Sequence, residues 1–126
     1  MEWITPKTDW SPNDNVTYED MNRISGNINY LYQQTIVRTD YTANDIVTLA
    51  EWSSIVSAIL DLAKGLGVVD AVPDMNVTAD NFNDVEELTL ATKEMIELIF
   101  IQISANIYAG DDLYISKSPE NYTRGV

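Results

Sequence analysis

The chain has 126 residues, of which 20 are acidic and 7 basic, and its formal net charge at pH 7 is −13. Cysteine and histidine are absent, which excludes disulfides and thiolate chemistry and removes the commonest acid–base group and metal ligand. Nucleic-acid phosphates repel a strongly acidic chain. The negative charge favours solubility and binding to a basic partner. We therefore expect no enzyme, no metal or cofactor site and no nucleic-acid partner.

A single helical domain is expected over residues 1–126, because a chain of this length can bury a core without disulfides or metals. No basic start precedes an apolar signal region, and no apolar run is long enough to cross a bilayer. We expect synthesis in a cytoplasm and no membrane partner.

Residues 1–16 are predicted to form an extended arm ahead of the first helix. Pro6 and Pro12 bias the residues before them away from helix. Trp3 and Trp10 are large apolar side chains that need a surface to bury against. The arm is therefore expected to lie along the helices, with both tryptophans as packing or assembly contacts.

A pattern that starts helices occurs three times, about thirty residues apart. In each copy a threonine can accept a hydrogen bond from a first-turn amide, and Asp, Glu or Asn follows three residues later. The best-formed copy pairs Thr48 with Glu51, whose carboxylate can reach back to the threonine amide. The three capping threonines are Thr17, Thr48 and Thr78.

A valine precedes each of these threonines, and a large apolar residue follows four positions after it. This spacing is typical of a hydrophobic staple, so Met21, Trp52 and Phe82 are expected to be buried. The match between the first two copies is longer than the capping pattern, because residues 8–31 align with residues 39–62. This longer match favours an internal duplication. The third copy keeps only part of the match, so a diverged repeat and convergence on a good helix start both remain open.

Three helices are predicted, over Tyr18–Ile36, Leu49–Lys64 and Ala79–Tyr108. The first two each carry one apolar stripe at three- and four-residue spacing. The second should end at Gly65 or Gly67 as a left-handed cap. The fold class is thus all-α, with a three-helix core over residues 17–110.

The third helix is unusual because it is apolar on nearly every side after Thr92. It is either a central core helix covered by the other helices and the arm, or a helix that meets another subunit. On the second interpretation the chain self-associates, and the candidate interface residues are Ile96, Ile99, Phe100, Ile103 and Ile107. Residues 111–126 are predicted to be a polar, extended tail, with a short strand at 111–116.

Paired carboxylates are the remaining candidates for chemistry. Pairs at residues 19–20, 86–87 and 111–112 would suit a glycosidase only if two of them faced each other across a cleft. Each lies in or near a predicted first or second turn, where acidic groups offset the positive helix end, and Glu19 is also placed to pair with Arg23. Calcium binding by the acidic residues at 40–45 is an alternative to turn formation, which the spacing favours.

The N-terminal third resembles a segment that recurs in tail, baseplate and fibre proteins of phages and prophages of Gram-positive bacteria. The residues that carry the resemblance are Trp3-Ile4-Thr5-Pro6-Lys7-Thr8-Asp9-Trp10, Asp20-Met21-Asn22-Arg23-Ile24, Asn27, Tyr30 and Leu31. The resemblance implies a virion component and not an enzyme, and it implies packing and assembly roles for its landmark residues. These landmarks are Trp3, Pro6, Trp10, Asn22, Arg23 and Tyr30.

The expected function is therefore a structural or adaptor subunit of a phage virion, in the tail or fibre, made in the bacterial host cytoplasm. Its partners would be other virion proteins and copies of itself, and the resemblance to fibre assemblies implies a trimer. The alternative is a small acidic phage-encoded inhibitor that imitates nucleic acid and blocks a host defence or DNA-binding protein. The net charge favours this alternative, whereas the spread of the carboxylates along the chain opposes it.

Overall fold

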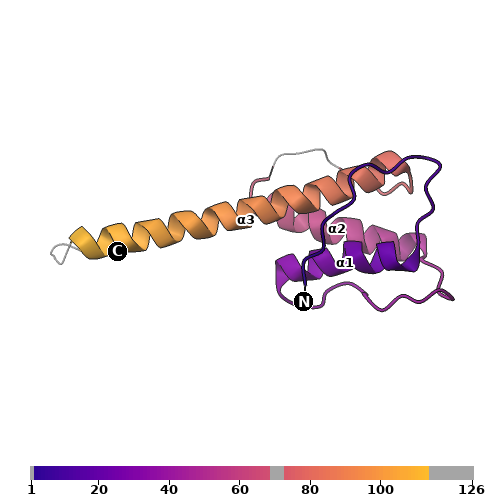
Figure 1. Cartoon of the computed structure of the whole chain (residues 1–126), viewed down its shortest axis with the longest axis horizontal. Helices are drawn as coiled ribbons and strands as arrows, with labels where there is room; N and C mark the ends of the chain where they lie inside the picture. Colours follow the sequence, from indigo (N-terminus) through magenta and orange to yellow (C-terminus); the bar gives the residue numbers. More distant parts are fainter. Residues whose placement is uncertain (1, 69–72, 114–126) are drawn as a thin grey trace. The chain divides into compact units, whose positions relative to one another are not determined.

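A computed structural model describes residues 2–68 and 73–113, with side chains described as far as Ser104. It contains three helices, α1 over Tyr18–Tyr32, α2 over Leu49–Gly65 and α3 over Ala79–Leu113 (Figure 1). The described ranges contain no strand. The predicted all-α class, with three packed helices of which the third is the longest, is confirmed.

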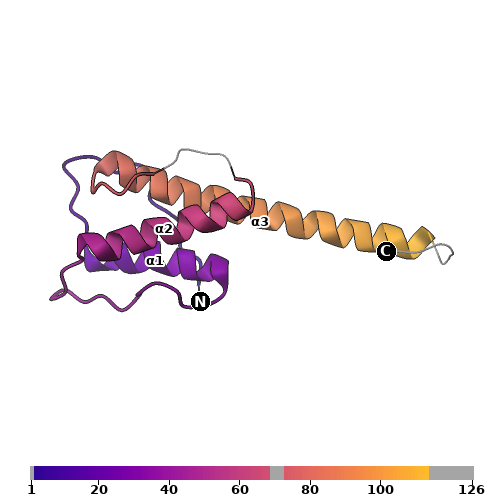
Figure 2. The same ribbon diagram turned by 180° about the vertical axis from the view of Figure 1, so that it is seen from behind.

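The chain divides into two compact units, residues 1–93 and residues 94–126. The first unit holds the arm, α1, α2 and the beginning of α3, and the second holds the rest of α3. Within the first unit the three helices run in the same direction (Figures 1 and 2). Residues 33–48 return the chain from the end of α1 to the start of α2, so both helices begin at the same end of the unit.

The capping boxes of α1 and α2 are formed as predicted. The amide of Glu51 donates to the Thr48 hydroxyl over 3.1 Å, and the amide of Thr48 donates to the Glu51 carboxylate over 3.0 Å. Thr17 and Asp20 make the equivalent pair of hydrogen bonds at α1. These boxes satisfy amides that the first turn leaves unpaired.

At α3 the cap is only half of a box. The amide of Asn81 donates to the Thr78 hydroxyl over 3.1 Å. The Asn81 side chain donates instead to the carbonyl oxygens of Asp74 and Asn76, so it holds the loop that precedes the helix. An amide side chain can act as a donor where a carboxylate cannot, and this accounts for the difference from the other two copies.

Buried apolar side chains from all three helices and the arm form one core cluster. Met21, Trp52 and Phe82 are buried, as the staple pattern predicts. The ring centroids of Trp52 and Phe82 lie 4.5 Å apart, and Trp10 of the arm meets Phe82 edge-on at 5.4 Å. Aromatic pairs at these separations add to the stabilisation from burial.

Helix α1 is shorter than predicted, since it ends at Tyr32 and not at Ile36. Gln33 takes a left-handed conformation, with φ of 57°, and ends the helix. The Asn29 side chain then accepts from the amides of Ile36 and Val37 and donates to the Val37 carbonyl, which holds the chain as it turns away. A side chain that replaces backbone partners in this way competes with the next helical turn.

The other helix ends also differ in detail from the prediction. Helix α2 is followed by Gly67 with φ of 73°, which confirms one of the two predicted left-handed glycines. Helix α3 continues to Leu113, so the strand predicted at 111–116 is wrong for its first three residues, and the remainder lies outside the described residues. The tail beyond residue 113 also lies outside them.

Candidate functional site

The arm is held on the helices by asparagine side chains that replace backbone partners. Asn83 of α3 accepts from the Trp10 amide over 2.7 Å and donates to the Trp10 carbonyl over 3.0 Å. Asn27 of α1 makes the same two-sided contact with the amide and carbonyl of Ile4. Each asparagine therefore binds the extended backbone as a neighbouring strand would, through one donor and one acceptor.

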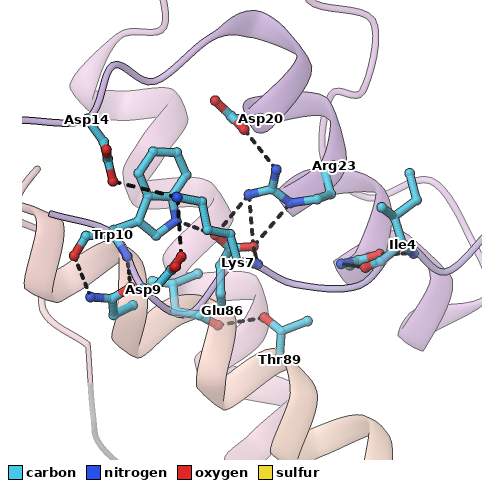
Figure 3. Close-up of polar contacts among 12 residues, drawn as sticks. Ile4, Lys7, Asp9, Trp10, Asp14, Asp20, Arg23, Glu86 and Thr89 are labelled. Atoms are coloured by element: carbon cyan, nitrogen blue, oxygen red, sulfur yellow. Dashed lines mark hydrogen bonds and ion pairs between the residues drawn. The ribbon is translucent and has the colours of Figure 1, made fainter.

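Glu86 of α3 lies at the centre of this attachment (Figure 3). Its carboxylate accepts from the Trp10 indole N–H and, over 3.0 Å, from the Lys7 amide. Arg23 of α1 approaches the same carboxylate with Nη2 at 2.9 Å, and its Nη1 contacts Asp20 at 2.8 Å. Only 2% of the Glu86 side chain is exposed, so these donors are the ones that satisfy a buried charge.

Two sequence-based interpretations are corrected by this arrangement. The sequence predicts that Glu86 offsets the positive end of its helix, but the side chain is a buried partner of the arm. Arg23 was expected to pair with Glu19, but it contacts Asp20 and Glu86. The Arg23 side chain is long and ends in a planar guanidinium, so it can bridge one carboxylate on α1 and one on α3.

The same contacts recur 31 residues later, in the segment before α2. Asn22 of α1 accepts from the Tyr41 amide and donates to the Tyr41 carbonyl, both over 2.9 Å, as Asn83 does for Trp10. The Arg38 guanidinium lies over the Tyr41 ring at 4.5 Å, as the Lys7 ammonium lies over the Trp10 ring at 5.0 Å. The resemblance between the first two sequence copies therefore extends to their tertiary contacts.

The acidic side chains at 40–45 are engaged in this repeated motif. Asp40 and Asp45 contact Arg38 at 2.6 and 2.8 Å, and Asp45 also accepts from the Thr42 amide at 2.7 Å. These contacts support turn formation over calcium binding. Within the described residues, no group of three potential metal ligands is close enough to hold an ion.

Hydrogen bonds lower the pKa values of the carboxyl groups in these turns and caps. The Ser11 amide lowers the pKa of Asp14, the Thr42 amide that of Asp45 and the Thr48 amide that of Glu51. Burial raises the pKa of Asp20, but hydrogen bonds from Thr17 and Arg23 outweigh it and lower the pKa overall. These four carboxylates therefore act as structural acceptors.

A pocket of about 570 Å³ lies where the three helices begin. The three helix-start copies contribute equivalent residues to its lining, namely Val16, Met21, Val47, Trp52, Val77 and Phe82. Val16 and Val77 are 43% and 62% exposed, so the pocket offers apolar surface to solvent at this end of the first unit. Its size is that of a site for a small molecule or for side chains of a partner.

The second unit carries a different apolar surface. Of the predicted interface residues, Phe100 is 70% exposed and Ile103 is 50% exposed, whereas Ile96 and Ile99 are half-buried. Leu98 and Ile101 are also exposed. Ile107 is also a predicted interface residue, and its side chain lies outside the part of the chain whose side chains are described.

The two tryptophans predicted as assembly contacts are both used within the chain. Trp10 is buried, and half-buried Trp3 packs between Tyr30, at 5.8 Å between ring centroids, and the Lys93 ammonium, at 5.2 Å. Sequence reasoning missed Asn83 and Glu86 as residues that hold the arm. A signal existed for Asn83, because it follows its capping threonine by five residues, as Asn22 does.

No helix among the described residues is long and apolar enough to span a membrane. Comparisons of the chain with protein-family models, with curated proteins and with solved structures found no match.

Proposed function

We propose that this protein is a structural subunit of a phage particle, in the tail or fibre, and that it works by assembly with copies of itself and with neighbouring virion proteins. The observation that carries the proposal is the exposed apolar surface of α3 between Leu98 and Ile103. Contiguous apolar surface of this kind marks interaction sites on proteins that are otherwise polar outside.

The N-terminal segment adds a second line of support. The landmark residues Trp3, Trp10 and Asn22 make contacts that attach extended segments to helices, and Arg23 joins α1 to α3. These are packing roles, as the resemblance to phage tail and fibre proteins implies. The pocket at the helix starts offers a further apolar surface to a neighbouring protein.

A nucleic-acid mimic is less well supported. Such a protein needs free carboxylates arrayed on one surface, whereas Asp20, Asp45 and Glu86 are bound by arginines of the same chain. The acidic groups of the helix caps are likewise occupied by backbone amides. The net charge alone does not distinguish the two functions.

The test is the composition of purified particles. Particles from the bacterium that encodes the chain should contain its peptides in fixed proportion to the other tail proteins, as measured by mass spectrometry. Deletion of the coding sequence should give particles with incomplete tails in electron micrographs. Absence of the chain from particles, together with salt-sensitive binding to a basic host protein, would overturn the proposal in favour of an inhibitor.

A further inference from the structure

The first unit is built from three equivalent parts, one for each sequence copy. In every copy the residues four and eight positions after the capping threonine are buried, and the three helices run in the same direction (Figures 1 and 2). The extended segments are attached in a cyclic order. Asn83 of α3 holds the segment before α1, and Asn22 of α1 holds the segment before α2.

The two asparagines occupy the same position, five residues after the capping threonine of their helix. Each segment therefore lies on the helix of the preceding copy, and α3 takes the place of a predecessor to α1. Head-to-tail contacts that return to their starting point form a ring. Two steps of such a ring are seen here, which gives the first unit approximate threefold symmetry within one chain. The segment of the third step includes residues 69–72, which lie outside the described residues.

The pocket at the helix starts shares this symmetry in its apolar part. Each sequence copy contributes its staple valine and the large residue five positions later, and the rest of the lining comes from the first two copies. The three large residues form a buried floor. The valines lie around it and are reached by solvent, with Val77 62% exposed, Val16 43% exposed and Val47 half-buried. A partner at this end therefore meets the same side chain three times.

We infer that the pocket binds the end of a homotrimeric protein, with the partner's threefold axis passing through the pocket and one partner subunit against each valine. Identical subunits present identical side chains, so three like contacts form together and strengthen one another. Interfaces between symmetric assemblies are constrained in the same way, because like surfaces meet like surfaces. This inference rests on the proposed function and names the symmetry of the neighbouring virion protein.

The charge around the pocket distinguishes such a partner from a second molecule of this chain. Among the described residues that line the pocket, Glu19 and Asp45 are acidic and none is lysine or arginine. A second molecule docked by the same end would bring these carboxylates against each other, and like charges across an interface oppose binding. Each partner subunit is therefore expected to carry a lysine or arginine beside the apolar side chain that meets a valine.

Cross-linking in purified particles tests the symmetry of the contact. A photo-cross-linking amino acid is placed at Val16, Val47 or Val77 in turn, and the cross-linked peptides are identified by mass spectrometry. All three positions should join to the same stretch of one partner protein, because identical subunits present the same residues to them. Joining to three different stretches, to different proteins or to a second molecule of this chain would overturn the inference.

Ile4 supplies a matched control for these positions. It is 49% exposed, close to the value for Val16, but it lies against Asn27, roughly 15 Å along α1 from the helix start. A cross-linker at Ile4 should not reach the stretch that the valines join. Val77→Asp should lower incorporation of the chain into particles about tenfold or more, since the contact would bury an unpaired carboxylate. Ile4→Asp should leave incorporation unchanged, and thermal unfolding of both variants checks that they fold.

The failure of this inference can be distinguished from the failure of the proposed function. A chain that is present in particles but gives no common cross-linked stretch, or is incorporated equally well as folded Val77→Asp, would overturn the threefold contact alone. The chain would then still be a virion subunit that meets its neighbours through other surfaces. Absence of the wild-type chain from particles would overturn both.

Discussion

The indole N–H of Trp10 donates to the buried carboxylate of Glu86, 76 residues further along the chain. The contact joins the beginning and the end of the first unit, because it attaches the arm before α1 to α3. The same carboxylate binds Arg23 of α1, so one side chain connects the arm, the first helix and the third. Charge-assisted hydrogen bonds of this kind are stronger than neutral ones, and their loss leaves a buried group unpaired.

Glu86→Ala is expected to destabilise the protein by about 3–5 kcal/mol, since removing one partner of a buried ion pair leaves the other uncompensated. The free energy of unfolding from urea titration provides the measurement. Glu87→Ala is the control, because this neighbouring glutamate is exposed and should change stability by less than about 0.5 kcal/mol. Equal effects of the two substitutions would contradict the role assigned to Glu86.

Asn83→Ala and Asn22→Ala should cost similar amounts, about 1–3 kcal/mol each, because each removes two hydrogen bonds to partly buried backbone groups. The two changes differ in the segment they release. Asn83→Ala should increase hydrogen exchange at the Trp10 amide, and Asn22→Ala should do so at the Tyr41 amide. Exchange that rises at both amides in both variants would argue against separate attachments.

Thr48→Ala should lower the free energy of unfolding by about 0.5–2 kcal/mol, because the Glu51 amide loses its acceptor at the start of α2. Thr48→Ser keeps the hydroxyl and should retain most of the stability. Chemical denaturation of both variants gives the comparison. An unfolding midpoint unchanged by Thr48→Ala would show that the cap contributes nothing measurable.

Stability should be nearly constant from about pH 6 to pH 8 and should fall below about pH 5. The pKa values of Asp14, Asp20, Asp45 and Glu51 are lowered in the folded state, so the unfolded chain binds protons first as the pH decreases. The stabilisation is present above the unfolded pKa values and is lost as the pH falls through the folded ones. The chain has no histidine to add a transition near neutrality.

Thermal unfolding followed by circular dichroism across this pH range provides the test. Asp20→Asn removes one of the four titrating groups and should make the acid decrease shallower. Loss of stability between pH 8 and pH 6 would show that groups other than these carboxylates control the pH dependence.

Local features of the sequence were sufficient to place the start of each helix. The caps at Thr17, Thr48 and Thr78 lie within a few residues of the groups they bind, so the pattern alone locates the start of each helix. The end of α1 was not predicted, because it depends on an asparagine that binds backbone groups seven and eight residues further along the chain. The same pattern also identified Met21, Trp52 and Phe82 as core residues, since a hydrophobic staple uses the apolar residue four positions after the capping threonine.

The role of Glu86 depends on tertiary structure. The equivalent positions of the first two copies hold Ser25 and Val56, and all three residues are buried. Only the arrangement of the arm, α1 and α3 brings Trp10, Lys7 and Arg23 to the third of these positions, where their donors make a buried carboxylate stable. Contacts within one helical turn are determined by neighbouring residues, whereas a contact across 76 residues forms only when the whole unit has folded.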